Sequence, residues 1–377
     1  MDGAGVIWMG RMRQLLVVLA CTALASSANA RAPRQAIAMP DSRSFMEATP
    51  QFLAEMRALV DARARAVADR LGPRMAVVAA WVEATSAGEE RRADVDALLR
   101  SATDSGAGDA MVWWMLLDAC GSLHEWCGSY RAHARTRLTE LEPDNAAVWL
   151  RLIRSHDGES DAVVRRYYLT RAAQSKRYED HERDWARVLR EFYAGIKIPE
   201  AHATAYTLGT GTEVARYTHI LGMASVVAGA AASSGEQCGE DGRPIGSAAV
   251  AAECRAVFGL MATSTNPLTR RIALEHALEL ADQPDDRRFR ALQLLRLLWV
   301  DAHWGELRLG IDDDTKIVAV FDDRIRDGEV ASREHILTRA GVDPAPPPDW
   351  DPPQLSPHLH ELLRDAGVIA ETAPAAR

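Results

Sequence analysis

The sequence predicts an all-α protein built as an array of tandem antiparallel helical hairpins. Three observations support this fold class. Apolar residues recur every three or four positions through most of the chain, the spacing that lines one face of a helix. Alternating β-branched runs and Asn-Gly turns, which mark strands and β-hairpins, are almost absent. Trp81, Trp113 or Trp114, Trp149 and Trp185 follow one another at a nearly constant interval.

The amino terminus predicts a cleaved secretory signal peptide over residues 1–30. Arg11 and Arg13 supply a basic region, residues 15–25 an apolar region, and the sequence Ala-Asn-Ala a cleavage site just before Arg31. The apolar region is too short for a permanent span, which takes about 20 apolar residues. One alternative remains open, because the sequence Val-Leu-Ala-Cys ending at Cys21 resembles a lipoprotein box whose cysteine carries a lipid anchor.

The charge of the chain argues against some classes of partner. The formal net charge is −9, and removal of residues 1–30, which hold two arginines and one aspartate, changes it to −10. Nucleic acid and anionic membrane surfaces are poor partners for such a chain. The signal peptide indicates a periplasmic or secreted protein, exported as in Gram-negative bacteria.

Four cysteines follow the signal peptide, and an even number in an oxidising compartment favours disulfides. Three connectivities are possible. We expect the local one, in which Cys120 pairs with Cys127 and Cys238 pairs with Cys254. Zinc is the weaker alternative, because neither pair has C-x-x-C spacing and no histidine stands at a ligand spacing beside them.

Composition and helix-breaking residues divide the rest of the chain into four parts. Residues 31–44 are a polar lead-in, and residues 45–200 form the helical hairpins. Residues 201–342 are a further helical region, and residues 343–377 hold a Pro-rich stretch, a short helix and a disordered tail. The helices that we expect from apolar periodicity cover residues 45–71, 75–84, 89–101, 111–120, 126–141 and 245–261.

Capping patterns mark further helix boundaries. Gly72 and Pro73 end the first helix. The sequences Asn266-Pro267 and Ser356-Pro357 each place a capping residue before a proline at the first helical position. Residues 220–232 are apolar and carry no charge, but they are too short to span a membrane, so we expect a buried helix.

The tryptophans predict a repeat. The step is 33 residues from Trp81 to Trp114, then 36 from Trp113 to Trp149 and 36 from Trp149 to Trp185. Each tryptophan falls in the expected first helix of a hairpin. A hairpin of this size cannot bury its apolar face alone, so neighbours stack and share a core. We therefore expect these tryptophans to pack in the repeat core.

One segment carries a family resemblance. Residues 141–152, Leu-Glu-Pro-Asp-Asn-Ala-Ala-Val-Trp-Leu-Arg-Leu, resemble the junction between two tetratricopeptide repeats, whose period is about 34 residues. Asp144 or Asn145 can cap the helix after the turn. Leu169 and Ala172 stand where the family has a large and a small packing residue. Arg165 departs from the pattern, because the family has a small residue there. The resemblance covers residues 74–195 and implies stacked helical hairpins.

Strong catalytic motifs are missing from the sequence, including H-E-x-x-H, G-x-S-x-G, the P-loop and the EF-hand loop. Four weaker patterns are explained without a ligand, as helix caps, polar loops or solvent-exposed helix faces. Residues 209–212 (Gly-Thr-Gly-Thr) resemble an anion-binding turn. The other three patterns are His358 with His360 and Glu361, His124 and Glu125 with His133, and Asp312 with Asp313 and Asp314.

These observations favour a non-enzymatic protein-interaction module that binds a protein or peptide and needs no cofactor or metal. The first alternative is a periplasmic hydrolase acting on cell-wall material, with its site in residues 201–262. The second is an outer-membrane lipoprotein accessory factor, which requires a lipid on Cys21.

Overall fold

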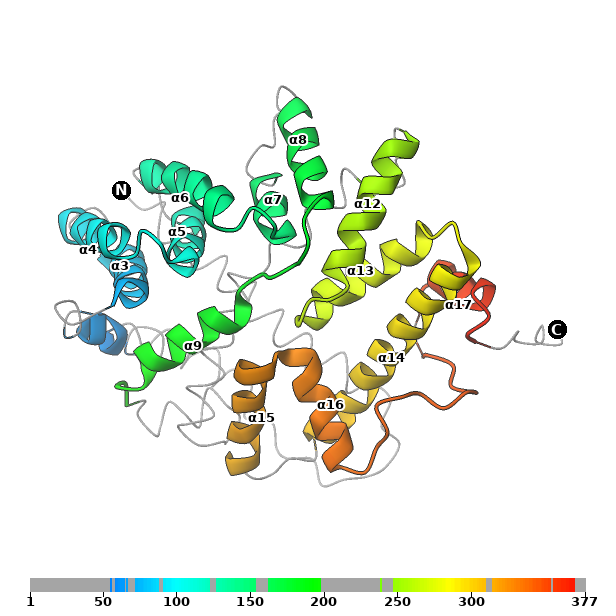
Figure 1. Cartoon of the computed structure of the whole chain (residues 1–377). Coiled ribbons are helices and arrows are strands. Elements are labelled where there is room, and N and C mark those ends of the chain that lie inside the picture. The colour runs from blue at the N-terminus through cyan, green and yellow to red at the C-terminus, as the bar shows by residue number, and fades with distance from the viewer. Residues whose placement is uncertain are drawn as a thin grey trace. The chain divides into compact units, whose positions relative to one another are not determined.

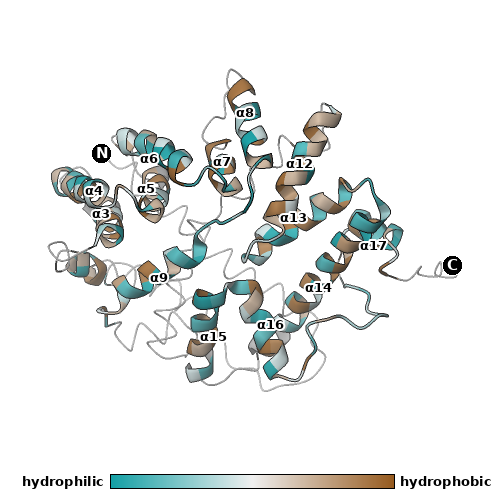
Figure 2. Cartoon of the chain, viewed as in Figure 1, coloured by the Kyte–Doolittle hydropathy of each residue, from teal (hydrophilic) through white to brown (hydrophobic). Residues whose placement is uncertain are grey.

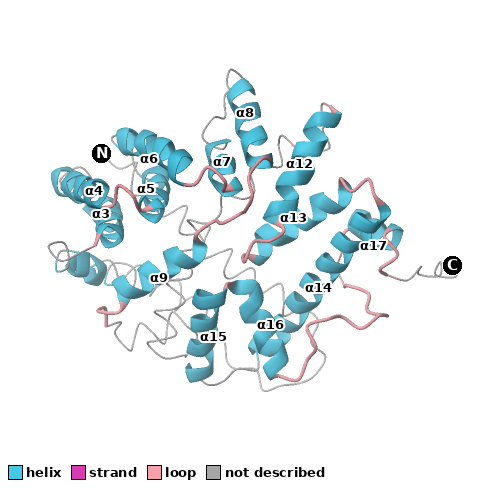
Figure 3. Cartoon of the chain, in the orientation of Figure 1, coloured by secondary structure: helices cyan, strands magenta, loops and turns pink. Residues whose placement is uncertain are grey.

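The computed structural model describes residues 55, 58–64, 66, 72–87, 91–122, 127–153, 162–197, 238, 247–309, 314–353 and 355–369. All of them belong to one unit, Glu47–Arg377. Within these ranges the regular elements are helices joined by loops and turns, and no strand occurs (Figure 3). The prediction of an all-α protein is confirmed.

The helices lie close to the expected boundaries. The amino-terminal helices are α3 (Pro73–Ala87), α4 (Arg92–Ser105), α5 (Ala110–Ser122), α6 (Gly128–Leu141), α7 (Ala146–Ile153), α8 (Ala162–Ala173) and α9 (Glu182–Tyr193). The carboxyl-terminal helices are α12 (Ala248–Met261), α13 (Pro267–Glu279), α14 (Pro284–Leu309), α15 (Asp314–Asp327), α16 (Glu329–Arg339) and α17 (Pro357–Asp365).

The predicted capping residues start their helices. Asn266 accepts a hydrogen bond from the Thr269 backbone N–H at 3.1 Å, and Pro267 is the first residue of α13. Ser356 does the same for α17, where the Leu359 N–H donates at 3.2 Å. A side-chain oxygen at this position satisfies one of the backbone donors that a helix leaves unpaired at its start.

Helices that follow each other in sequence pack as pairs. α3 lies against α4, α5 against α6, and α7 against α8 (Figure 1). Neighbouring pairs also touch, because α3 contacts α5, α6 contacts α7, and α12 contacts both α7 and α8. α9 departs from this pattern, since its most extensive contacts with other described helices are with α3 and α15.

The carboxyl-terminal helices pack on one another. α13 contacts α12, α14 and α17, and α16 contacts α14 and α15. Helices such as α14 and α16 carry both hydrophobic and hydrophilic residues (Figure 2), as expected for helices with one buried face. The Pro-rich stretch 343–353 has turns and no helix, and Trp350 contacts Trp299 edge-on with ring centroids 5.1 Å apart.

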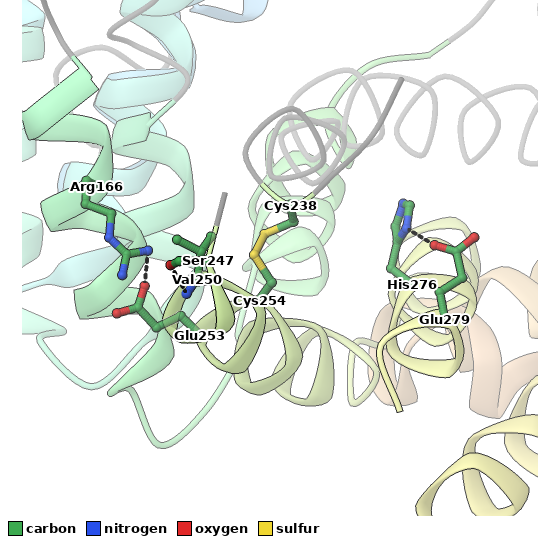
Figure 4. Close-up of a disulfide and its surroundings, with 8 residues drawn as sticks. All are labelled: Arg166, Cys238, Ser247, Val250, Glu253, Cys254, His276 and Glu279. Atoms are coloured by element: carbon green, nitrogen blue, oxygen red, sulfur yellow. Dashed lines mark hydrogen bonds and ion pairs between the residues drawn. A yellow bond between two sulfur atoms is a disulfide. The ribbon is translucent and has the colours of Figure 1, made fainter. Parts of the chain in front are cut away.

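Two disulfides join the four cysteines that the structure describes. Cys120 bonds to Cys127, and Cys238 bonds to Cys254, so the local pairing is confirmed. Figure 4 shows the second bridge, which attaches residue 238 to α12. One residue before Cys254, Glu253 forms an ion pair with Arg166 of α8 and accepts a hydrogen bond from Thr170 at 3.1 Å. Residue 238 is therefore fixed to a helix that is itself fixed to α8.

Removal of either disulfide should lower stability. The paired cysteines are 7 and 16 residues apart in the sequence, so both bridges close short loops. The chain-entropy argument then assigns about 2–3 kcal/mol to each bridge. We expect Cys120→Ser with Cys127→Ser to lower the free energy of unfolding by that amount in urea denaturation. Peptide mapping without reductant checks the pairing, and a Cys120–Cys238 peptide would contradict it.

In the part of the chain that is described, no helix combines the length and apolar character that a membrane crossing requires.

Candidate functional site

All five tryptophans of the predicted repeat are buried. Trp113, Trp149 and Trp185 are each the fourth residue of their helix, whereas Trp81 is the ninth residue of α3. The two intervals of 36 residues therefore connect three tryptophans at the same helical position, and the interval of 33 does not.

Trp113 and Trp149 also make corresponding contacts. Each indole N–H donates to the backbone carbonyl six residues earlier, at 3.1 Å to Ala107 and at 2.9 Å to Pro143. Each ring packs on the second helix of its own pair. The ring of Trp113 meets His133 of α6 with centroids 4.9 Å apart, and that of Trp149 meets Tyr168 of α8 at 6.1 Å.

Trp185 is held differently, although it occupies the same helical position. Its indole N–H donates to Asp118 of α5 at 3.0 Å, and its ring meets Trp81 of α3 edge-on at 6.0 Å. Asp118 is buried and also forms an ion pair with Arg151 of α7. A single carboxylate of α5 thus connects α7 and α9.

The loops before α7 and α9 are joined to each other. Asn145 and Arg177 form an isolated parallel β-bridge, in which the Ala146 N–H donates to the Arg177 carbonyl at 2.8 Å. The Asn145 side chain bonds to both loops, because its Oδ1 accepts hydrogen bonds from the backbone N–H groups of Ala147 and Glu179. Asn145, one of the two expected candidates, is therefore the residue that caps α7.

Glu142 is the centre of a buried polar cluster. Its carboxylate accepts hydrogen bonds from the Trp114 indole at 3.0 Å, from Asn145 at 2.8 Å and from Arg177 at 3.0 Å. The ring nitrogen Nε2 of His181 lies 3.1 Å from the same carboxylate. Burial alone would raise the pKa of Glu142, but the hydrogen bonds and charge of His181 and the indole donor outweigh burial and lower it.

His181 bridges two carboxylates. Its Nδ1 lies 3.1 Å from Asp184, opposite the contact with Glu142, and its ring lies against Trp114 with centroids 5.3 Å apart. Burial would lower the pKa of His181, but hydrogen bonds to Asp184 and Glu142 raise it to about 9. The imidazole is therefore protonated at neutral pH, and both ring N–H groups donate. Its backbone has φ of 58°, a conformation uncommon outside glycine.

The cluster is better suited to crosslinking than to catalysis. A general base must be able to take up a proton near neutral pH, and here the imidazole already holds one between two carboxylates. Both oxygens of the Glu142 carboxylate already accept hydrogen bonds, so the carboxylate is not open to a substrate. We interpret Glu142, His181 and Asp184 as a charged crosslink between α5, the α6–α7 loop and α9.

The crosslink predicts a pH dependence of stability. The pKa of His181 is raised from 6.5 to about 9 on folding, so its stabilisation is complete below pH 6.5 and is lost as pH rises through 9. We expect the free energy of unfolding to be lower at pH 9.5 than at pH 6.5. The difference should be at most about 3 kcal/mol, because one pKa unit corresponds to about 1.4 kcal/mol.

Urea denaturation at both pH values checks this prediction. His181→Gln should remove most of the difference, because glutamine does not titrate. An equal pH dependence in the wild type and in this variant would mean that His181 titrates with its ordinary pKa.

The other predicted candidates do not converge on one site. His358 contacts Glu279 of α13 at 3.1 Å, and His360 contacts Asp351 at 3.0 Å, so the two imidazoles have different partners. His133 packs on Trp113. Among the residues whose placement is described, no group of three or more His, Cys, Asp or Glu side chains has the geometry of a metal site.

Several predictions concern parts of the chain outside the described residues. They are the signal peptide and Cys21, residues 209–212, the helix over 220–232, His124 with Glu125, and the acidic residues 312 and 313. Most of the region 201–246, in which we placed the alternative hydrolase site, lies outside as well. These remain predictions.

Comparison of the chain with models of known families finds no match, and comparisons with curated proteins and with solved structures find none either.

Proposed function

We propose that this protein is an exported, periplasmic array of helical hairpins that acts as a protein-interaction module. The observation that carries the proposal is the shared geometry of Trp113 and Trp149. Two hairpins 36 residues apart repeat the same indole hydrogen bond and the same packing against their second helix. Stacked hairpins of this kind present extended surfaces that bind partners.

The contacts between hairpins support a tetratricopeptide-like arrangement. α3 touches α5, α6 touches α7, and α12 touches α7 and α8, as expected if each pair lies on the next. The two disulfides support export, because such bonds persist in oxidising compartments and are rare in the bacterial cytosol.

One surface is suited to a partner. Val163 and Tyr167 lie one turn apart on α8 and are 81% and 54% exposed. The Tyr167 ring rests on Tyr168 and Trp149, with centroids 5.6 and 6.2 Å away, so a half-buried tyrosine and a buried tryptophan support it. Tyrosines are enriched at protein interfaces, because they supply a rigid apolar ring and a polar hydroxyl. We call Val163 and Tyr167 the α8 surface.

Site-specific photocrosslinking tests this function. A photoreactive phenylalanine derivative at position 167 should capture one periplasmic protein in cells, whereas the same derivative at the exposed Ala132 of α6 should not. The purified partner should then bind Tyr167→Ala at least about tenfold more weakly than the wild type. Equal capture from both positions, or unchanged affinity of Tyr167→Ala, would contradict a role for the α8 surface.

Export makes a separate prediction about processing. Cleavage after the Ala-Asn-Ala sequence leaves a mature chain that begins with Arg31. Intact-mass analysis of the protein purified from the periplasm should give the mass of residues 31–377. A lipid-modified chain that begins with Cys21 would replace this prediction with the lipoprotein alternative.

A further inference from the structure

A cavity of about 300 Å³ lies between α13, α14 and α16. This volume is at the lower end of the range for small-molecule sites, roughly 300–1,000 Å³. The cavity is partly open to solvent, so a ligand can enter it or extend out of it. The residues that line it are Arg270, Gln293, Arg296, Leu297, Val330 and Glu334.

The charges in this cavity are not balanced. Arg296 donates from Nε to Glu334 at 2.8 Å, so these two side chains compensate each other. The Arg270 side chain makes no hydrogen bond or ion pair with any residue that the structure describes, and its Nε is buried. Burial lowers the pKa of Arg270, and the nearby charge of Glu334 opposes this effect. Among the described residues, the Arg270 guanidinium therefore has no carboxylate paired with it.

A second polar group of the cavity also lacks a partner. The Oε1 atom of Gln293 is buried and accepts no hydrogen bond from the described residues. Leaving a buried acceptor without a donor is unfavourable, so a ligand that brings an N–H group gains from this contact. Leu297 and Val330 are buried apolar residues and supply the hydrophobic part of the wall.

We propose that this cavity binds the carboxylate of an N-acylated amino acid, either as a free small molecule or as the carboxyl end of a peptide. The guanidinium of Arg270 matches a carboxylate through two parallel hydrogen bonds. The amide N–H of the ligand reaches Gln293, and a short apolar side chain contacts Leu297 and Val330. A phosphate monoester fits less well, because it brings almost two negative charges to one uncompensated cation.

This inference does not depend on the proposed interaction function. The cavity belongs to α13, α14 and α16, whereas the resemblance to tetratricopeptide repeats covers residues 74–195.

Titration with N-acetyl-leucine, followed by calorimetry and by saturation-transfer NMR, tests the proposal. N-acetyl-leucine should bind the wild type, and N-acetyl-leucinamide, which lacks the charge, should bind at least about tenfold more weakly. Arg270→Gln should weaken binding of the acid by a similar factor. Arg271→Gln is the matched control, because the next residue of the same helix pairs with Glu275 and does not line the cavity.

The two sources of the carboxylate are separated by an acetylated alanine peptide that ends in leucine. If this peptide binds at least about tenfold more tightly than N-acetyl-leucine and loses that binding when its carboxyl end is amidated, the ligand is the end of a peptide. If the peptide binds equally or more weakly, the ligand is the free acid. Thermal unfolding of each variant confirms that it is folded. Gln293→Leu is a second variant, and it should weaken binding of N-acetyl-leucine. The proposal is overturned if the acid does not bind, if acid and amide bind equally, or if Arg271→Gln matches Arg270→Gln.

Discussion

Glu142→Ala should destabilise the protein by about 3–5 kcal/mol. The substitution removes one partner of a buried ion pair and leaves the protonated His181 without one of its two carboxylates. Removing one partner of a buried ion pair lowers the free energy of unfolding by this amount, because the remaining charge stays buried without its partner. The Trp114 indole and the Asn145 amide lose their acceptor as well. Urea denaturation at pH 6.5 measures the loss.

Glu140→Ala is the matched control for this prediction. Glu140 lies two residues away in α6, but it is exposed, and among the described residues its carboxylate pairs only with Arg137, one helical turn earlier. Exposed pairs contribute less than about 1 kcal/mol. Equal losses for the two alanine variants would mean that the Glu142 cluster does not act as a crosslink.

Glu142→Gln separates charge from shape. Glutamine keeps the size of the side chain and one acceptor oxygen, but it removes the negative charge beside His181. We expect a smaller loss of stability than for alanine and a lower pKa of His181, which NMR titration of the imidazole can measure. An unchanged imidazole pKa would show that Asp184 alone accounts for the raised value.

Trp149→Ala should also lower the free energy of unfolding strongly, by about 3–5 kcal/mol. Truncation of a large buried aromatic residue leaves a cavity that the surroundings fill only in part. Trp149 packs against Tyr167 and Tyr168, lies under the guanidinium of Arg171, and donates to the Pro143 carbonyl. Helicity in the far ultraviolet should be retained below the melting temperature, because no helix loses its backbone hydrogen bonds.

Two further variants make this result specific. Trp113→Ala should cost about as much as Trp149→Ala, because both side chains are buried, donate to the carbonyl six residues earlier and pack on the second helix of their pair. Trp350→Ala should cost much less, since Trp350 is only half-buried in the Pro-rich stretch. A small loss for Trp149→Ala beside a large one for Trp113→Ala would remove the main support for the repeat.

The sequence by itself determined the features that depend on short stretches of chain. The all-α class follows from apolar spacing, and the starts of α13 and α17 follow from capping residues whose side chains reach an N–H three residues away. Disulfide pairing was predictable for a similar reason, because cysteines close in sequence need little chain entropy to meet. The position of Trp113, Trp149 and Trp185 in their helices was also visible as a period of 36 residues.

The polar cluster around Glu142 and His181 was not predicted from the sequence, although part of its signal is present there. Glu142 stands next to Pro143 at the end of a helix, and His181 lies in a run of charged residues before α9. Each pattern reads locally as the polar surface of a loop. Nothing in either segment indicates that residues 142 and 181 meet, because the β-bridge between their loops joins positions 32 residues apart.

Only the tertiary structure decided which side chains share an environment. Trp185 has the same helical position as Trp149, yet it contacts Trp81 and Asp118, because α9 packs on α3 and α15. Arg270 is one of many arginines in the sequence, and it is distinguished by lining a cavity between three helices without a carboxylate partner among the described residues. Helix formation depends on neighbours within a few residues, whereas burial and pairing depend on contacts between distant segments that the local sequence does not encode.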